Sequence, residues 1–276
     1  MNRTDQPLDV DALRAGVVGP WAGIDVVERT GSTNADLLAA AAAGAPDRTV
    51  LTADHQDAGR GRLTRSWAAP AGTGIAVSVL LRPQGVAPSR FGWLPLLAGL
   101  AVLDTVREVG VGTAGLKWPN DCLVGVEQRK VAGILAEVSG QVSGQISPAV
   151  VLGIGLNVTA APPDTPTATS LAAEGCDASR TDVLVTLLRR LAEREAEWRD
   201  ARGDPDAHRL RADYRAGCLS LGSQVRVELP AAAPIVGIAE DVDRDGRLLL
   251  LDAAGHRRAV AAGDVVHVRP TDRAPG

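Results

Sequence analysis

The chain changes character near residue 218, and this change constrains its fold more than any other feature. Up to residue 217, strand-like and helix-like segments alternate, which is typical of a layered α/β architecture. From residue 218 onwards, short strand-like segments follow one another, separated by turn residues such as Asp245 and Gly246. We therefore predict an α/β (α+β) domain over residues 1–217 and a small all-β barrel domain over residues 218–276.

Hydrophobic periodicity predicts the elements of the first domain. Helices are expected behind Ser32, Thr33 and Asn34, which are N-cap residue types, and at 91–108 and 181–198, with a short one around Leu210 and Tyr214. A hairpin is expected to join the segments at 116–121 and 129–139, and strands are expected at 24–29, 49–54, 75–81 and 148–158.

Composition excludes several classes of protein. The net charge is −4, whereas a dedicated nucleic-acid-binding domain is normally basic. The most apolar stretch, residues 93–103, is too short to cross a bilayer and contains Pro95 and Gly99. The three cysteines are far apart and form no CxxC pair, which argues against structural zinc and against a disulfide framework. We expect a soluble, cytoplasmic protein with free thiols.

The segment GRGRLTR, residues 59–65, combines three arginines with two glycines. Guanidinium groups bind phosphate or carboxylate oxygens in pairs, and glycines let a backbone approach a ligand closely. The spacing fits neither GxxxxGK[ST] nor GxGxxG, since Thr64 stands where a third glycine would be required. Taken alone, the segment is equally well a solvated surface loop or an incidental nucleic-acid contact.

Two further segments carry candidate ligand contacts. Asn120 and Asp121 in KWPND are oxygen ligands of the kind that Mg²⁺ accepts beside ATP phosphates. Lys130 in RKVAGI either points into a site or, by period-2 alternation, outward to solvent, while Gly133 favours close approach of another group. The glycines of GIGLNV, residues 153–158, suggest a flat surface or a bulged core strand.

In this order and spacing the segments resemble the catalytic domain of biotin–protein ligases. The matching strings are GSTN, QDAGRGRLTRSW, KWPND, RKVAGILAE and GIGLN, spread over residues 31–157. The resemblance implies a core like that of class II aminoacyl-tRNA synthetases and biotin–lipoate ligases, followed by an SH3-like barrel. It implies that biotin is activated with ATP as biotinyl adenylate and transferred to a lysine of the biotin carboxyl carrier domain of an acetyl-CoA carboxylase.

The resemblance also implies a role for each matched residue. Lys130, Arg62 and Asp121 are expected to be catalytic, and Asn120 and Asp121 to lie near Mg²⁺. Biotin is expected to contact Ser32, Thr33, Asn34, Gln56, Gly59, Arg60, Gly61, Arg62, Lys130 and Gly133. ATP or the adenylate is expected to contact Arg60, Arg62, Arg65, Trp67, Lys117, Asn120, Lys130 and Asn157.

ATP and Mg²⁺ are thus the expected co-substrate and metal, biotin is the substrate, and no tightly bound organic cofactor is expected. Residues 1–30 are fewer than the roughly 50 that a folded domain needs, so we expect no DNA-binding domain and no DNA or membrane partner. Two alternatives stay open. One is a lipoate–protein ligase or related acyltransferase with the same lysine-acylation chemistry. The other is a non-catalytic binding protein that uses the arginine loop for RNA or the barrel as an interaction module.

Overall fold

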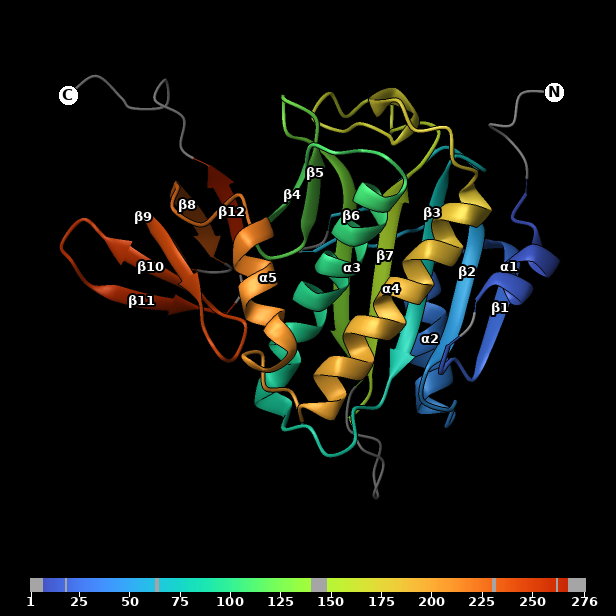
Figure 1. Ribbon diagram of the computed structural model, residues 1–276, viewed down its shortest axis with the longest axis horizontal. Helices are drawn as coiled ribbons and strands as arrows, with labels where there is room; N and C mark the ends of the chain where they lie inside the picture. The colour runs from blue at the N-terminus through green and yellow to red at the C-terminus, as the bar shows by residue number, and fades with distance from the viewer. Residues whose placement is uncertain are drawn as a thin grey trace.

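The apolar segments between residues 23 and 157 form one seven-stranded mixed sheet (Figure 1). The computed structural model describes residues 7–17, 19–62, 65–139, 148–229, 232–261 and 263–267. In spatial order the strands are β1 (Gly23–Thr30), β2 (Thr49–Gln56), β3 (Gly74–Leu81), β7 (Val150–Asn157), β6 (Arg129–Val138), β5 (Asp121–Val124) and β4 (Ala114–Lys117). β1 and β2 are parallel, and every other neighbouring pair is antiparallel.

Alternation along the strands decides which helices cover each face of this sheet. On β7, Leu152 and Ile154 belong to the main core, together with residues of α3 (Leu94–Glu108) and α4 (Arg180–Asp200). The neighbouring Val151 points to the other face, where it packs with Leu37 and Ala41 of α2 (Thr33–Ala42). Among the described helices, α2 contacts β2, β3 and β7 on this second face, and a cavity lies beside its N-terminus.

Local signals place α2 on this face. Ser32 has an extended backbone and its side chain accepts a hydrogen bond from the amide of Ala35, as an N-cap residue does. Gly44 follows the helix with φ of +92°, a left-handed conformation that ends helices and favours glycine. Residues 32–34 are therefore fixed at the N-terminal end of a helix that lies against the sheet.

The C-terminal part is a five-stranded antiparallel sheet, in the order β11 (Arg257–Val260), β10 (Leu248–Asp252), β9 (Ala232–Val242), β8 (Gln224–Leu229) and β12 (Asp264–His267). It follows α5 (Leu210–Gly217). Val225, Val227 and Leu250 are fully buried on its inner face. Within the described part of the chain, no hydrogen-bonded pair joins β11 to β12. The all-β domain is confirmed, and closure of its barrel stays a prediction.

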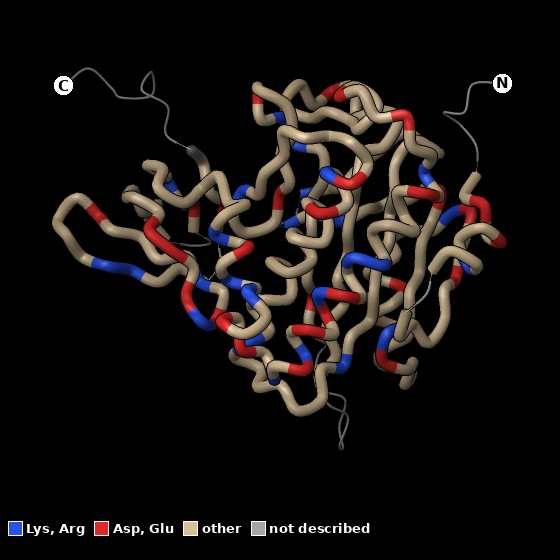
Figure 2. Tube along the Cα trace, in the orientation of Figure 1, with Lys and Arg blue, Asp and Glu red and all other residues tan. Residues whose placement is uncertain are grey.

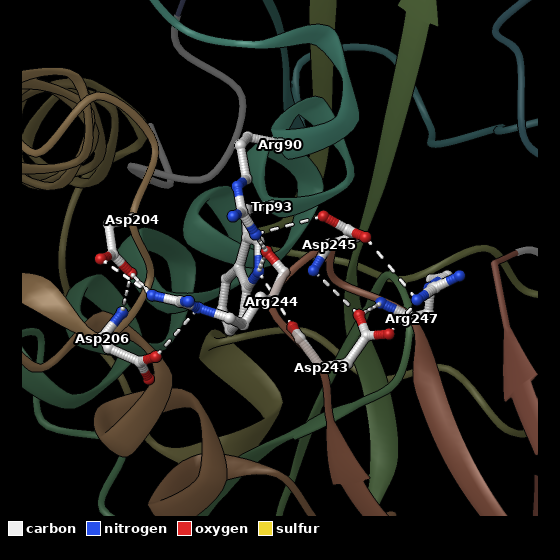
Figure 3. A network of polar contacts seen from close by, with 8 residues as sticks. All are labelled: Arg90, Trp93, Asp204, Asp206, Asp243, Arg244, Asp245 and Arg247. Atoms are coloured by element: carbon white, nitrogen blue, oxygen red, sulfur yellow. Dashed lines mark hydrogen bonds and ion pairs between the residues drawn. The ribbon is translucent and has the colours of Figure 1, made fainter.

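The turn between β9 and β10 fastens the two domains together (Figure 3). The Arg90 guanidinium donates to the Arg244 carbonyl at 2.6 Å, and the Trp93 indole N–H points at the carbonyls of the same turn. Arg244 pairs in turn with carboxylates of the α4–α5 connection, Asp204 and Asp206. Gly92 and Gly246 pack so closely that a Cβ on either would meet the backbone of the other segment.

Several elements differ from the sequence-based expectation. The polar N-terminal segment contains α1 (Val10–Gly16), which the periodicity did not predict. The expected helix at 91–108 is divided into a 3₁₀ segment, η2 (Pro88–Trp93), and α3. The helix expected at 181–198 is observed as α4. Among the described helices, none is long and apolar enough to span a membrane.

Charge and thiols agree with the sequence-based expectations. Lys and Arg are interspersed with Asp and Glu along both domains (Figure 2). Cys122, Cys176 and Cys218 are buried and free, so the prediction of unpaired thiols is confirmed.

Candidate active site

A cavity lies on the open part of the sheet face, beside the N-terminus of α2. It brings together most of the residues singled out from the sequence. Its lining includes Ser32, Thr33, Asn34, Gln56, Arg60, Gly61, Arg62, Arg65, Trp67, Asn120, Asp121, Lys130 and Gly133. Segments separated by about a hundred residues in the chain therefore meet at one place, as the resemblance implied.

The floor of the cavity at α2 is a buried hydrogen-bond network. Gln56 Oε1 accepts from the Thr33 amide at 2.8 Å and from Thr33 Oγ1 at 3.0 Å. Ser78 Oγ, fully buried on β3, lies 2.7 Å from Thr33 Oγ1 and 2.6 Å from Asn34 Oδ1. Buried polar groups of this kind are costly unless each is paired, so the network holds the segment in a single arrangement.

The arginine segment folds back on itself as a short two-armed loop. The Trp67 amide donates to the Gly59 carbonyl at 2.8 Å, and the Gly61 amide donates to the Arg65 carbonyl at 2.6 Å. A Cβ at Gly59 would overlap the Trp67 carbonyl, and one at Gly61 would crowd the backbone of Arg65. The two glycines thus permit the two arms of the loop to approach each other.

Trp67 lies flat on the sheet because two glycines make room for its ring. Gly133 on β6 and Gly155 on β7 are directly opposite each other in the strand register. A Cβ at Gly155 would overlap the indole, and one at Gly133 would come within 3.2 Å of it. The flat surface expected from these glycines exists, and Asn34, packed on Gly153 in the same way, occupies its other part.

A β-bulge decides the direction of Lys130. The register between β5 and β6 shifts so that Cys122 opposes Ala132 while Leu123 opposes Lys130. Val131 is the extra residue and points into the core, where it is fully buried. Lys130 and Gly133, three positions apart, consequently share the cavity face, and the outward alternative for Lys130 is not realised.

Lys130 and Asp121 form the charged centre of the cavity. Lys130 Nζ lies 2.7 Å from Asp121 Oδ1 and 5.7 Å from the centroid of the Trp67 ring. Burial lowers the pKa of Lys117, an effect that the nearby Asp121 carboxylate opposes and Lys130 reinforces. Burial likewise lowers the pKa of the Arg62 guanidinium, again against the effect of Asp121. One carboxylate is therefore surrounded by several cations, an arrangement suited to a further anionic group.

The C-terminal domain also reaches this cavity. Arg65 forms an ion pair with Asp264 of β12, and Arg62 Nη2 donates to the Gly263 carbonyl at 3.2 Å. Asp264 belongs to the cavity lining. The charged residues that line it are Arg60, Arg62, Arg65 and Lys130 against Asp121 and Asp264, so cations predominate.

Asn120 and Asp121 are the residues expected near a metal. The side-chain amide of Asn120 donates a hydrogen bond to the Ile134 carbonyl at 3.1 Å, which holds the side chain in place. One carboxylate with one amide oxygen fits a Mg²⁺ ion that takes its other ligands from nucleotide phosphates and water. Among the described residues there is no cluster of three or more His, Cys, Asp or Glu that would hold a metal by itself.

Three predicted residues do not line the cavity. Gly59 borders an adjoining open cleft between the domains, and Lys117 lies near enough to Asp121 and Lys130 for their charges to affect its pKa. Asn157 is buried at the end of β7, where its amide donates to the Thr169 carbonyl at 3.0 Å. Their contacts with ATP or biotin stay predictions.

Sequence reasoning did not single out Ser78, Glu137, Gly263 or Asp264. Ser78 had a signal, because it is the one polar residue in the apolar run IAVSVLL. Glu137 stands in the matched string RKVAGILAE but received no role. Residues 263 and 264 carried no signal, since only the packing of the domains brings β12 to the arginine loop.

Comparison with known proteins agrees with this geometry. A sequence profile of the Biotin/lipoate A/B protein ligase family matches residues 26–157, and a profile of the Biotin protein ligase C terminal domain matches residues 220–268. The chain is 50% identical to a biotin–[acetyl-CoA-carboxylase] ligase of Mycobacterium tuberculosis (strain ATCC 25618 / H37Rv), over 97% of this chain and 98% of that protein. It is 31% identical to the bifunctional ligase/repressor BirA of Bacillus subtilis (strain 168), over 86% of this chain and 71% of that protein.

Among solved structures, the chain is similar to the biotin protein ligase from Aquifex aeolicus in complex with biotin and ATP. The TM-score is 0.73 at 28% sequence identity, covering 90% of this chain and 100% of the other. The two profile matches fall on the two folded parts in the same order, and the identity to the mycobacterial protein extends over nearly the whole chain. The chain therefore belongs to the biotin/lipoate A/B protein ligase family.

Proposed function

We propose that the protein activates biotin with ATP and transfers it to a lysine of the biotin carboxyl carrier domain of a carboxylase. One observation carries the proposal: Lys130, Asp121 and the loop arginines line the same cavity as Ser32, Thr33 and Gln56. A cation-rich region suits phosphates and a carboxylate, while the adjoining network of fixed hydrogen-bonding groups suits a small polar ring such as the ureido group of biotin.

In the first half-reaction, a carboxylate oxygen of biotin attacks the α-phosphorus of ATP in line. A new P–O bond forms, the bond to the β-phosphate oxygen breaks, and pyrophosphate leaves. Negative charge spreads over the phosphoryl oxygens as this happens, and Lys130 with Arg62 stabilises it electrostatically. Asp121 pairs with Lys130 at 2.7 Å and so holds its ammonium group at the cavity.

Asn120 and Asp121 are the residues that would hold Mg²⁺ beside the phosphates, and the ion would neutralise part of the charge on the leaving pyrophosphate. Trp67, flat on Gly133 and Gly155, offers an aromatic face for adenine. The described residues of the arginine loop, Arg60, Gly61, Arg62 and Arg65, line the same cavity, and we propose that they exclude water from the mixed anhydride.

In the second half-reaction, the ε-amine of the carrier lysine attacks the acyl carbonyl. An amide bond forms, the acyl–phosphate bond breaks, and AMP leaves with the electron pair. The attacking amine has to be neutral, and Asp121 is the carboxylate at the reacting centre that accepts or orients its proton. The open cleft beside Gly59, lined also by Arg247 of the C-terminal domain, gives the carrier lysine a route to this carbonyl.

We also propose the cellular compartment in which the enzyme acts and the partners that it does not bind. The reaction consumes ATP, and the three buried cysteines are free thiols, which suits a cytoplasmic enzyme. We propose no DNA or membrane partner, because Lys and Arg are interspersed with Asp and Glu along both domains (Figure 2).

Mass spectrometry of a biotin carboxyl carrier domain tests the proposal. The carrier is incubated with the protein, biotin, ATP and Mg²⁺, and each small component is omitted in turn. One biotinyl addition at a single lysine is expected in the full mixture. No addition is expected when any one of the small components is omitted. Lipoate replaces biotin in a parallel reaction, and lipoylation in place of biotinylation would contradict the proposed substrate.

A further inference from the structure

Glu137, near the end of β6, connects two parts of the site that are far apart in the chain. Its Oε2 atom accepts from Asn34 Nδ2 at 2.8 Å, and its Oε1 atom pairs with Arg60 Nη1 at 3.4 Å. Asn34 belongs to the segment at the start of α2, whereas Arg60 belongs to the arginine loop. A single carboxylate thus bridges the floor of the cavity and the loop that covers it.

The contacts of Asn34 show that its amide is committed to the protein. One N–H of Nδ2 points to Glu137 and the other to the Leu135 carbonyl at 3.4 Å, while Oδ1 accepts from Ser78. Because a carboxylate only accepts hydrogen bonds, Glu137 also fixes which way the amide is turned. Asn34 is 4% exposed and lies against Gly153, so it has little freedom to turn toward a ligand.

Arg60 is held differently. Its side chain is 50% exposed, and its Nη1 atom contacts Glu137 at 3.4 Å, the long end of the hydrogen-bond range. A guanidinium group has five N–H donors in a rigid fork, so most of them stay available to an incoming carboxylate. Glu137 limits where Arg60 can point without using up its capacity to bind an anion.

We propose that Glu137 is a positioning residue that links the biotin subsite to the placement of Arg60. The inference rests on the proposed function and deepens it. Asn34 holds Glu137 in place, and Glu137 holds the Arg60 guanidinium above the position that the substrate carboxylate takes when Thr33 and Gln56 bind the ring. Asn34 acts in this coupling through Glu137 rather than as a direct hydrogen-bond partner of the ring.

Chemistry explains why a carboxylate stands at this position. Two equivalent oxygens satisfy two donors at once, one from an amide and one from a guanidinium group. Glutamine has the same shape but a single acceptor oxygen, so Glu137→Gln satisfies either Asn34 or Arg60 and presents an N–H to the other. The substitution therefore separates the two partners without creating a cavity.

A double-mutant cycle on the full-length protein tests the coupling. Biotin affinity is measured by isothermal titration calorimetry, without ATP, for the wild type, Glu137→Gln, Arg60→Ala and the double variant. Glu137→Gln is expected to weaken biotin about tenfold in the wild type, as for loss of a charge-assisted hydrogen bond, and much less in the Arg60→Ala background. Equal weakening in both backgrounds, or none in either, would overturn the proposal.

Two controls distinguish positioning from loss of structure. Glu193→Gln removes a surface ion pair of α4 with Arg190 and is expected to leave biotin affinity unchanged. In steady state, Glu137→Gln should raise the KM for biotin and leave the KM for ATP unchanged, whereas partial misfolding lowers the active fraction without that split. If Glu137→Gln does not fold, Arg60→Ala alone must still raise the KM for biotin, and an unchanged value contradicts the coupling.

The result also separates this inference from the proposed function. A wild-type protein that fails to bind biotin would refute the function itself. A wild-type protein that binds biotin and biotinylates the carrier, with additive effects in the cycle, would refute only the role of Glu137.

Discussion

The substitution Gly155→Ala tests whether the Trp67 ring needs the space that Gly155 leaves on the sheet. The added Cβ would overlap three atoms of the indole, whose ring also extends over the facing Gly133. The ring therefore has to shift away from Gly155, and with it the aromatic face proposed for adenine. Stacking of a base on an aromatic side chain contributes about 1–3 kcal/mol. Since about 1.4 kcal/mol corresponds to a tenfold change, the KM for ATP should rise roughly five- to 150-fold.

ATP–pyrophosphate exchange measures this change without any carrier protein. The KM for biotin should change little, because Thr33, Gln56 and Ser78 hold their arrangement without Trp67. Thermal unfolding is expected to show a loss of about 1–3 kcal/mol from overpacking. Gly23→Ala is the matched control, since nothing lies within 4 Å of a Cβ at that position.

A second variant makes the test decisive. Trp67→Ala removes the obstacle, so Gly155→Ala should have almost no further effect on the KM for ATP in that background. The reasoning would be refuted if Trp67→Ala raised the KM for ATP while Gly155→Ala left it unchanged.

Three further predictions follow from buried groups. Ser78→Ala leaves Asn34 Oδ1 without its donor, so stability should fall by about 1–3 kcal/mol and biotin affinity should fall with it; calorimetry showing both unchanged would contradict the network. Burial raises the pKa of Cys122 to about 12, so this thiol should resist a thiol reagent at pH 8 until denaturant unfolds the chain, and a fast reaction in the native protein would contradict that burial. Lys117→Met should weaken ATP binding while keeping or raising stability, because burial lowers the pKa of Lys117. In the unfolded chain Lys117 has its ordinary pKa of 10.5 and binds its proton more tightly than in the folded chain. The stability of the wild type should therefore rise with pH between the lowered folded pKa and 10.5. A Lys117→Met variant with the same rise would refute the assignment.

Much of the order of elements, and the meeting of the matched segments in one cavity, could be predicted from the sequence. Local patterns predicted β1, β2, β3, β7 and α4. The alternation along β1, the apolar runs of the buried β3 and β7, and the apolar face of α4 are each visible in the sequence. The motif strings predicted that Lys130, Asp121 and Arg62 belong to one site, and the three residues line one cavity. Those predictions depend on local pattern, which a single sequence carries.

What the sequence did not reveal depends on register and on contacts between distant segments. Period-2 alternation leaves the direction of Lys130 open, and only the bulge at Val131 turns it toward the cavity. The glycines of β6 and β7 indicated close packing, but not that Trp67 and Asn34 would be the groups packed there. The contact of Arg65 with Asp264 depends on the docking of the turn at Gly246 against Gly92, for which neither segment carries a motif.

The most direct test of the account concerns the convergence of Lys130 and the loop arginines on one acyl phosphate. Rapid-quench measurements follow adenylate formation and transfer from preformed biotinyl adenylate separately in Lys130→Met. Adenylate formation should slow by about 10²–10³, as when a preorganised electrostatic contact is lost, while transfer is affected far less. An adenylation rate equal to that of the wild type would contradict the central role given to this cavity.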